Sequence, residues 1–170
     1  MARVGVISDT HGLVRPEAAA FLRGSDVIIH AGDIGDPAVL QELAALAPVT
    51  AVRGNNDKGA WAARVPPTAT VRVGDVRIHV VHDLAELDDA ALPRGVRVVV
   101  SGHSHQPSVR ERDGVLLMNP GSAGPRRFSL PIAVGELRIT GASVRARIVE
   151  LDVAATARPR RRPTRGGRTR

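Results

Sequence analysis

Short runs of β-branched residues recur along the chain, with turn-forming residues between them. Ten runs have this character: RVGVIS (3–8), DVIIH (26–30), VTAVR (49–53), ATVRV (69–73), VRIHVVH (76–82), VRVVV (96–100), PSVRER (107–112), VLLMN (115–119), IAVGELRI (132–139) and SVRARIVEL (143–151). Runs of this length and composition, bounded by Gly, Pro, Asn or Asp, are typical of β-strands. The pattern therefore predicts ten strands.

Helical stretches fall between several of the early strands. Residues 16–23 begin with a proline and are followed by Gly24, which is the expected order of helix start and stop signals. Residues 37–47 are rich in Ala and Leu, follow Asp36 as a candidate N-cap, and end before a proline. We expect a third helix at residues 84–92.

Strands and helices alternate over the first hundred residues, and strands dominate afterwards. Alternation predicts an α/β layered fold with parallel strands early and an antiparallel, hairpin-rich second half. Gly74-Asp75 and Asp113-Gly114 each separate two strand runs and are two-residue hairpin signals. We see no internal repeat and no second folded domain.

The net charge of +7 belongs to one end of the chain. Residues 158–170 contain seven arginines and no acid, which leaves 17 basic and 17 acidic residues in the other 157. We expect one domain at 1–152 and a disordered Arg-rich tail at 153–170, because the tail has no apolar face to bury. Such a tail can make weak, non-specific contacts with nucleic-acid phosphates, or it can be a solvated appendage.

Composition excludes some kinds of site. The chain has no cysteine, so any metal must be held by nitrogen and oxygen atoms. The first apolar stretch is too short for a signal peptide, and no window is long enough for a membrane span. We expect a cytoplasmic protein without a membrane partner; its oligomeric state is not indicated.

Polar side chains follow five of the predicted strands, at the point where each strand ends. The five segments are Asp9-Thr10-His11, Ala31-Gly32-Asp33, Gly54-Asn55-Asn56-Asp57, His82-Asp83 and Ser101-Gly102-His103-Ser104-His105. Ligands bind at the carboxyl ends of strands in α/β sheets. If these strands are parallel, the five segments converge on one edge of the sheet.

Asp, His and Asn side chains suit Mn²⁺, Fe²⁺, Zn²⁺, Ni²⁺ or Co²⁺, and we expect Mn²⁺ among these. Asp9, Asp33 and four or more neutral donors are too many for one ion, and they suit two ions with a bridging carboxylate. Two divalent cations, two carboxylates and one hydroxide leave a charge of about +1, which matches a phosphodiester monoanion. This chemistry predicts hydrolysis by a hydroxide that the metal centre activates.

The order D-x-H, G-D, G-N-x-D, a strand-final His and G-H-x-H resembles the calcineurin-like metallophosphoesterase superfamily. The spacing, with the late MNPGS at 118–122, is most similar to its small single-domain bacterial and archaeal phosphodiesterases, and the resemblance covers residues 3–150. It implies a four-layer α/β fold, in which a two-sheet β-sandwich is flanked by helices and has a dinuclear metal centre at one edge.

The resemblance also implies a ligand for each position. The first ion would be held by Asp9, His11, Asp33 and His105, and the second by the bridging Asp33 with Asn55, His82 and His103. The expected catalytic residues are Asn55, Asn56 and His103. His103 or His105 would act as an electrostatic partner while bound to metal, and Gly102 would let the backbone turn close to the ions.

This sequence departs from the family pattern at two places. Asn56 stands where larger members have a histidine proposed as general acid; its amide cannot supply that proton but could donate to a phosphate oxygen. Asp83 follows His82 where the family usually has glycine. Asp83 could orient His82, perturb the site or face solvent.

Several other residues have two interpretations. His82 is preferred over His79 as the strand-final ligand because His79 lies in mid-strand and faces the opposite side. His30 is expected to pack as a core histidine. Trp61 could be core or rim. Four residues are expected to be solvated or to shape turns rather than bind substrate: Arg53, Arg127, Asn119 and Ser122.

The most consistent interpretation is a metal-dependent phosphodiesterase acting on a phosphate-ester small molecule or a nucleotide. The alternative is a catalytically weak or inactive binding or scaffold protein on the same fold, since the superfamily includes a trafficking-coat subunit of that kind. A metal-independent hydrolase is disfavoured because no Ser or Cys nucleophile stands beside a dedicated base.

Overall fold

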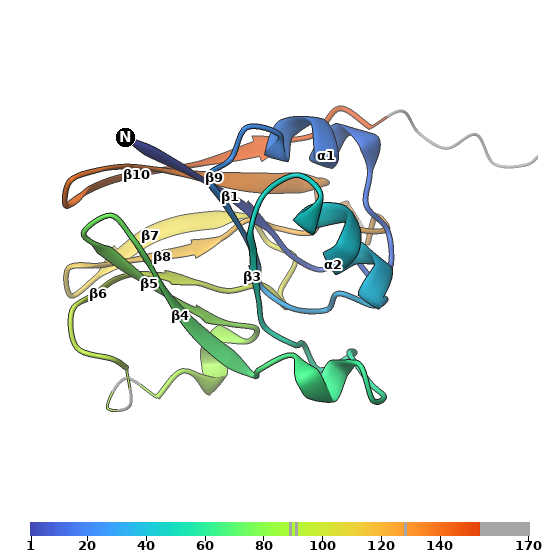
Figure 1. Ribbon diagram of the computed structural model, residues 1–170, viewed down its shortest axis with the longest axis horizontal. Coiled ribbons are helices and arrows are strands. Elements are labelled where there is room, and N and C mark those ends of the chain that lie inside the picture. Colours follow the sequence, from blue (N-terminus) through green and yellow to red (C-terminus); the bar gives the residue numbers. More distant parts are fainter. Residues whose placement is uncertain (89, 91, 128, 154–170) are drawn as a thin grey trace, which may run out of the picture.

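Two five-stranded sheets face each other in the computed structural model, which describes residues 1–88, 90, 92–127 and 129–153 (Figure 1). The first sheet has the order β10-β9-β1-β2-β3 and contains β1 (Ala2–Ile7), β2 (Val27–His30), β3 (Val49–Ala51), β9 (Ala133–Thr140) and β10 (Ser143–Glu150). The second has the order β4-β5-β6-β8-β7 and contains β4 (Thr68–Val73), β5 (Val76–Val81), β6 (Val96–Val100), β7 (Ser108–Arg112) and β8 (Val115–Asn119). All ten predicted strands are confirmed. The predicted tail, apart from residue 153, lies outside the described residues.

Both sheets are mixed, which corrects the prediction of an antiparallel second half. In the first sheet β1, β2 and β3 are parallel, whereas β9 pairs antiparallel with β1 and β10. In the second sheet β5, β6 and β8 are parallel, and β4 and β7 are antiparallel edge strands. The near-continuous apolar run of β6 is typical of a parallel strand covered on both faces. Each sheet thus presents its own row of parallel strand ends.

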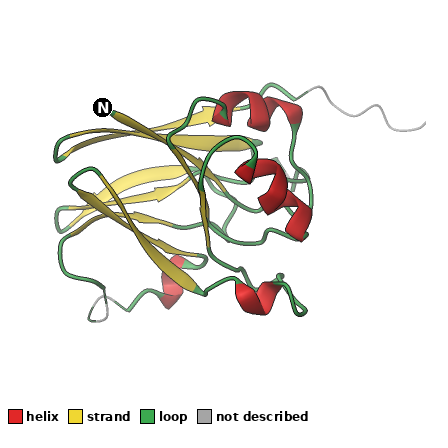
Figure 2. Cartoon of the chain, in the orientation of Figure 1, coloured by secondary structure: helices red, strands yellow, loops and turns green. Residues whose placement is uncertain are grey.

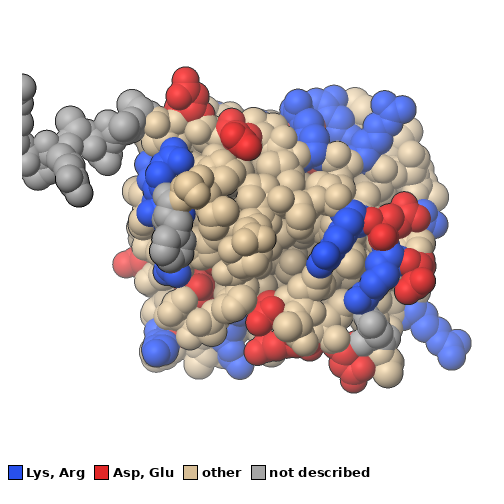
Figure 3. Space-filling model, turned by 180° about the vertical axis from the view of Figure 1, so that it is seen from behind, with Lys and Arg blue, Asp and Glu red and all other residues tan. Residues whose placement is uncertain are grey.

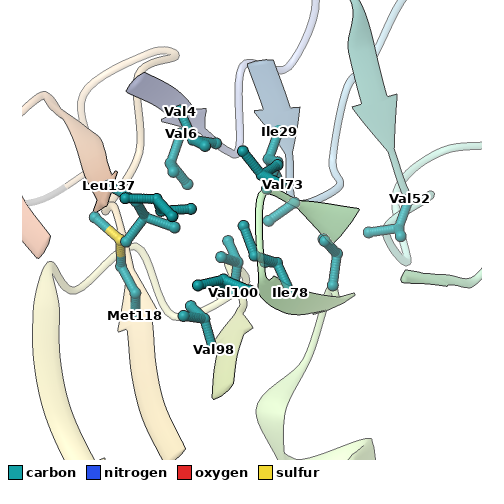
Figure 4. Packing of buried hydrophobic residues seen from close by; sticks show 14 residues of the cluster. Val4, Val6, Ile29, Val52, Val73, Ile78, Val98, Val100, Met118 and Leu137 are labelled. Carbon is teal, nitrogen blue, oxygen red and sulfur yellow. The ribbon is translucent and has the colours of Figure 1, made fainter. Parts of the chain in front are cut away.

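The main core fills the space between the two sheets (Figure 4). Alternation along β1 turns Val4 and Val6 toward the second sheet, where Val98, Val100 and Met118 meet them, all fully buried. Burial of such side chains contributes about 1.5–3 kcal/mol each. The facing apolar rows hold the two sheets together.

Two helices cover the outer face of the first sheet (Figure 2). Helix α1 (Pro16–Leu22) and helix α2 (Pro37–Ala44) bury Leu22 and Leu43 against the face of the sheet that carries Ile28. The predicted cap is confirmed, because the Asp36 side chain accepts a hydrogen bond from the Ala38 amide. Trp61 is half-buried against this same cluster, so it belongs to the core.

The predicted helix at 84–92 is wrong. A single 3₁₀ turn, η2 (Leu84–Glu86), stands there, and a second one, η1 (Ala62–Arg64), precedes β4. The Asp88 side chain accepts from the Ala90 amide and turns the backbone away from a helical path. Leu84 and Leu87 instead pack on the outer face of the second sheet. Among the described residues, no helix has the length and hydropathy that a bilayer crossing needs.

Charged side chains of both signs occur on the face shown in Figure 3, around an uncharged central area. This distribution agrees with the equal numbers of acidic and basic residues in the first 157 positions. No large surface of one sign is visible on this face. The folded part therefore offers no extended basic surface here for a polyanion.

Candidate metal centre

The five polar segments predicted from the sequence meet at one end of the molecule, and they come from two sheets instead of one. Three follow β1, β2 and β3 in the first sheet, and two follow β5 and β6 in the second. Backbone hydrogen bonds join neighbouring segments: Asp9 N–H donates to the Gly32 carbonyl (3.0 Å), and Gly102 N–H donates to the His82 carbonyl (2.9 Å). The site therefore lies across the boundary between the two sheets, called the seam below.

Left-handed backbone conformations are concentrated at this end. Six non-glycine residues in the described part of the chain have a positive φ, and five of them are predicted ligands: Asp9 (54°), His11 (48°), Asp33 (53°), His103 (64°) and His105 (58°). Each costs roughly 1–2 kcal/mol relative to a right-handed conformation. Strain of this kind clusters at functional sites and persists only where the surrounding structure holds it.

Asp9, His11 and His105 form a first group that could hold a cation, with one ligand atom of each within 4.8 Å of the others. The Asp9 Oδ2 atom accepts from the Ser8 hydroxyl (2.6 Å) and the His103 amide (3.1 Å). The buried Asp9 Oδ1 and His105 Nδ1 atoms have no hydrogen-bond partner among the described residues. Buried polar atoms without partners are costly, so a ligand for them is expected here.

Asp9, Asp33 and His82 form a second group that meets the same distance condition. His82 Nδ1 donates to the Ala31 carbonyl at 2.7 Å, which directs the Nε2 atom into the site. His82 Nε2 lies 3.1 Å from Asn55 Oδ1 and 3.4 Å from Asp33 Oδ1. A carboxylate oxygen, an amide oxygen and an imidazole nitrogen thus face one point.

Asp33 lies between the two groups of histidines. Its Oδ1 atom faces His82 Nε2 at 3.4 Å, and its Oδ2 atom faces His11 Nε2 at 3.9 Å. Asn56 donates to it twice, from its backbone amide to Oδ1 (2.9 Å) and from its side-chain amide to Oδ2 (2.6 Å). The Asn56 side chain therefore faces a carboxylate, and it would have to leave Asp33 to reach a phosphate oxygen.

The charges of this cluster favour a bound cation. Burial raises the pKa of Asp33, but hydrogen bonds from His82 and Asn56 outweigh it and hold that pKa well below its usual range. Burial lowers the pKa of His82, and its hydrogen bond to Asp33 more than compensates, so the net direction is upward. Burial lowers the pKa of His11. Asp33 is consequently ionised at neutral pH inside a largely buried site.

His103 lies at the rim of the site and outside both groups. Its Nδ1 atom is 3.1 Å from Asn55 Oδ1, and its side chain is 45% exposed. Asp83, which had three open interpretations, faces His103 and not His82: its Oδ2 atom is 3.6 Å from His103 Nε2.

A hollow of about 420 Å³ opens beside His103 and His82. The residues that line it are Arg53, Gly54, Asn55, Pro67, His82, Asp83, Glu86 and His103. Arg53 also donates to the Val65 carbonyl (3.3 Å), and on the other side of the site Arg127 approaches His11 Nε2 to 3.5 Å. Both arginines, expected on a solvated face, therefore border the site.

Asp57 and Ser8 support the site, and the sequence analysis gave neither a role. The Asp57 carboxylate accepts from the amides of Ile34 (3.1 Å), Gly35 (2.8 Å) and Gly54 (2.7 Å), and so ties the loops after β2 and β3 together. In the sequence, Asp57 could have been found as the last residue of the G-N-x-D motif. Ser8, which donates to Asp9, has no comparable signal in the sequence.

Gly102 is required because of close approach. A Cβ atom at this position would lie 2.0 Å from the Ser8 hydroxyl and 2.7 Å from Asp9 Oδ2. The strand end after β6 therefore passes directly over the first carboxylate, as predicted for a glycine beside the metals.

The remaining polar residues behave as the sequence indicated. His30 is fully buried, accepts from the Gly32 amide at Nδ1 and donates from Nε2 to the Thr10 hydroxyl. His79 pairs with Thr70 in mid-strand, away from the site. Asn119 and Ser122 hydrogen-bond to backbone groups of the loops around Gly102 and Asp9.

Fold and site together define a class of protein: a two-sheet α/β sandwich with a buried carboxylate and histidine centre at the ends of its parallel strands. The chain belongs to the calcineurin-like phosphoesterase superfamily, whose domain model matches residues 2–141. Proteins of this superfamily use divalent metal ions, which agrees with the two donor groups described above.

Individual proteins agree with this assignment. The chain is 38% identical over 159 residues to a probable metallophosphoesterase of Methanothermobacter thermautotrophicus, which covers 86% of this chain and 91% of the relative. Among solved structures, it is similar to a novel archaeal phosphodiesterase (TM-score 0.71, 24% identity, 86% of this chain and 99% of the other). It is also similar to Vps29 of Chaetomium thermophilum (TM-score 0.70, 18% identity, 89% and 97%). The two structural likenesses show the shared fold.

Proposed function

We propose that the protein is a metal-dependent phosphodiesterase with a dinuclear centre. The observation that carries the proposal is that the seven predicted ligand positions all hold competent donors and gather at one end. Five of them form two groups that share Asp9, and Asn55 and His103 lie beside the second group. The probable metallophosphoesterase and the archaeal phosphodiesterase to which the chain is similar support the same activity. Nitrogen and oxygen donors accept several first-row ions; Mn²⁺ is the proposed ion, with Ni²⁺, Zn²⁺, Fe²⁺ and Co²⁺ as alternatives.

Each side chain has a proposed place. Asp9, His11 and His105 hold the first ion, and Asn55, His82 and His103 hold the second. Asp33 bridges them, because its two carboxylate oxygens face histidines of different ions. When bound, the ions would activate water as the nucleophile and stabilise charge on the phosphate.

The chain's own residues position the substrate. Two carboxylates and one hydroxide against two divalent ions leave a charge of about +1, which suits a singly charged diester better than a doubly charged monoester. The hollow beside His103 can take the alcohol part of the ester, with Arg53 at its wall. Neither Asn55 nor Asn56 can donate a proton to the leaving group, so a good leaving group or a water molecule is required.

The test is hydrolysis by chelated protein with single metals restored. We expect a chromogenic phosphodiester to be hydrolysed faster than the matching monoester when Mn²⁺ returns, and Asp33→Asn to lower the rate by about 100-fold or more. Asp113→Asn is the matched control, because Asp113 also has a left-handed backbone but lies in the β7–β8 turn. Preference for the monoester would contradict the diester assignment.

A scaffold protein is the second candidate, and the similarity to Vps29 favours it. The two candidates differ in turnover and not in metal binding. Bound metal with no hydrolysis of either ester, under any of the ions, would place the scaffold first. Small phosphate esters and nucleotides remain the proposed substrates of the enzyme.

A further inference from the structure

We propose that Asp83 is a positioning residue that orients His103 toward the second metal ion. The inference rests on the proposed dinuclear centre and adds a residue to it. It concerns a carboxylate that is particular to this chain, since the family pattern usually has glycine after the strand-final histidine. A glycine there has no side chain with which to contact His103.

Both oxygens of Asp83 are engaged. Oδ1 accepts from the Ala85 amide at 2.9 Å and so caps η2, the 3₁₀ turn Leu84–Glu86. Oδ2 lies 3.6 Å from His103 Nε2. The cap fixes the rotation of the carboxylate, so the oxygen that faces His103 is held in place by the backbone of a neighbouring turn.

His103 needs such a partner more than the other histidines do. The side chains of His11, His82 and His105 are 17%, 6% and 5% exposed, whereas that of His103 is 45% exposed. His82 is also fixed by the Ala31 carbonyl. For the exposed His103 ring, packing provides one edge-to-face contact with His82, at 5.2 Å between ring centroids.

Both ring nitrogens of His103 face oxygen atoms that can only accept: Nε2 lies 3.6 Å from Asp83 Oδ2, and Nδ1 lies 3.1 Å from Asn55 Oδ1. A metal ion binds only a ring nitrogen that carries no proton. If Nδ1 held the ion, the ring proton would therefore lie on Nε2, toward Asp83. Asn55 Oδ1 also lies 3.1 Å from Nε2 of His82. A cation bound among these three atoms would meet the lone pairs of both nitrogens and of the amide oxygen.

Outer partners of metal-bound histidines fix the ring and raise its basicity, and their loss typically weakens metal binding by about 10- to 100-fold. Asp83→Asn retains an oxygen that can cap η2 but removes the charged acceptor for His103. We therefore expect the affinity for the second Mn²⁺, the ion at His103, to fall by about 10-fold or more, while the affinity for the first ion changes less than about twofold.

The experiment is calorimetric titration of Mn²⁺ into chelated full-length protein, with the Co²⁺ absorption spectrum as a second readout that does not depend on activity. Asp83→Ser also caps η2 and should behave like Asp83→Asn. Glu86→Gln is the matched control, because Glu86 lines the same hollow but has no contact with His103 among those that the structure shows. The control should bind both ions like the wild type.

The outcomes separate this inference from the proposed function. Wild-type affinities in Asp83→Asn and Asp83→Ser, an equal loss of both ions, or a wild type that binds a single ion would each overturn the positioning role. A wild type that binds two ions and hydrolyses neither ester would overturn the phosphodiesterase. In that case selective loss of the second ion in Asp83→Asn would still support the inference.

Discussion

Hydrogen bonds on both sides of a buried ring determine where its proton lies. His30 illustrates this below the site: Gly32 donates to Nδ1, so Nε2 carries the proton and donates to Thr10, whose hydroxyl donates to the Ile34 carbonyl. This chain requires a neutral ring. Burial accordingly lowers the pKa of His30 to about 4.

The His30 pKa makes stability depend on pH. The ordinary value is 6.5 and the folded value is lower, so as the pH falls below about 6.5 only the unfolded chain takes up the proton. We expect this contribution to the free energy of unfolding to fall by up to about 1 kcal/mol per pH unit between pH 6.5 and 4. Urea unfolding of wild type and His30→Asn measures it; the other five histidines are present in both proteins, so the difference reports His30. A constant difference across this range would contradict the prediction.

At the scale of elements, one buried carboxylate joins three strands. Glu136 on β9 accepts from Arg3 on β1, from Arg138 (2.8 Å) and from Arg147 on β10 (2.9 Å). Arg3 continues the network, since it donates to the carbonyls of Phe21 and Arg23 at the end of α1. Burial raises the pKa of Glu136, but the three arginines outweigh it and lower the pKa to about 2.

Glu136→Gln should therefore cost about 1–2 kcal/mol at pH 7, a modest value because two of the three arginines are about half exposed. The folded pKa is depressed from 4.5, so the difference between wild type and variant should shrink as the pH falls from about 4.5 to 2. Denaturant unfolding at several pH values tests this, with the exposed Glu150→Gln as control. A difference that persists at pH 2 would assign the effect to packing.

The elements also show where sequence patterns succeed and fail. Strand runs and the Gly74-Asp75 and Asp113-Gly114 turns are local features, and all were predictable. The helix at 84–92 failed because Leu84 and Leu87 fit a helical spacing while a tertiary surface, the outer face of the second sheet, decides their conformation. Similarly, the predicted strand ends identified the candidate ligands, but no local pattern shows that these strands belong to two different sheets.

Residues that hold the metal-binding side chains or their loops in place were the least predictable from the sequence. Asp57 binds three amides from two loops, and Asp83 faces a histidine 20 positions away, so both depend on contacts that exist only in the folded chain. Metal-binding residue types such as His and Asp at strand ends can be recognised from their chemistry alone. The residues that hold them in place, Asp57 and Asp83, cannot be distinguished in the sequence from other aspartates in turns.

At the scale of the whole molecule, charge is divided between a neutral folded part and an Arg-rich segment. Removing residues 158–170 removes seven positive charges and leaves equal numbers of acidic and basic residues. We expect this truncation to abolish salt-sensitive binding of single-stranded nucleic acid, because phosphate contacts dominate such binding. Hydrolysis of a small diester should stay within about twofold of the full chain.

Fluorescence anisotropy at low and high salt measures the binding, and the chromogenic diester assay measures hydrolysis on the same samples. Nucleic-acid binding that survives truncation would place the contact on the folded part, against the mixed charge seen in Figure 3.

The seam-spanning position of the centre has a consequence for the order of events during synthesis. A nascent chain that has been made as far as residue 55 already carries Asp9, Asp33 and Asn55. His82 and His105 follow strands that are made later, and β1 still lacks β9, which pairs with it from residues 133–140. A complete set of donors therefore exists only after most of the chain has left the ribosome. We therefore expect metal binding to be a late step in maturation, because incompletely made chains have only part of the donor set.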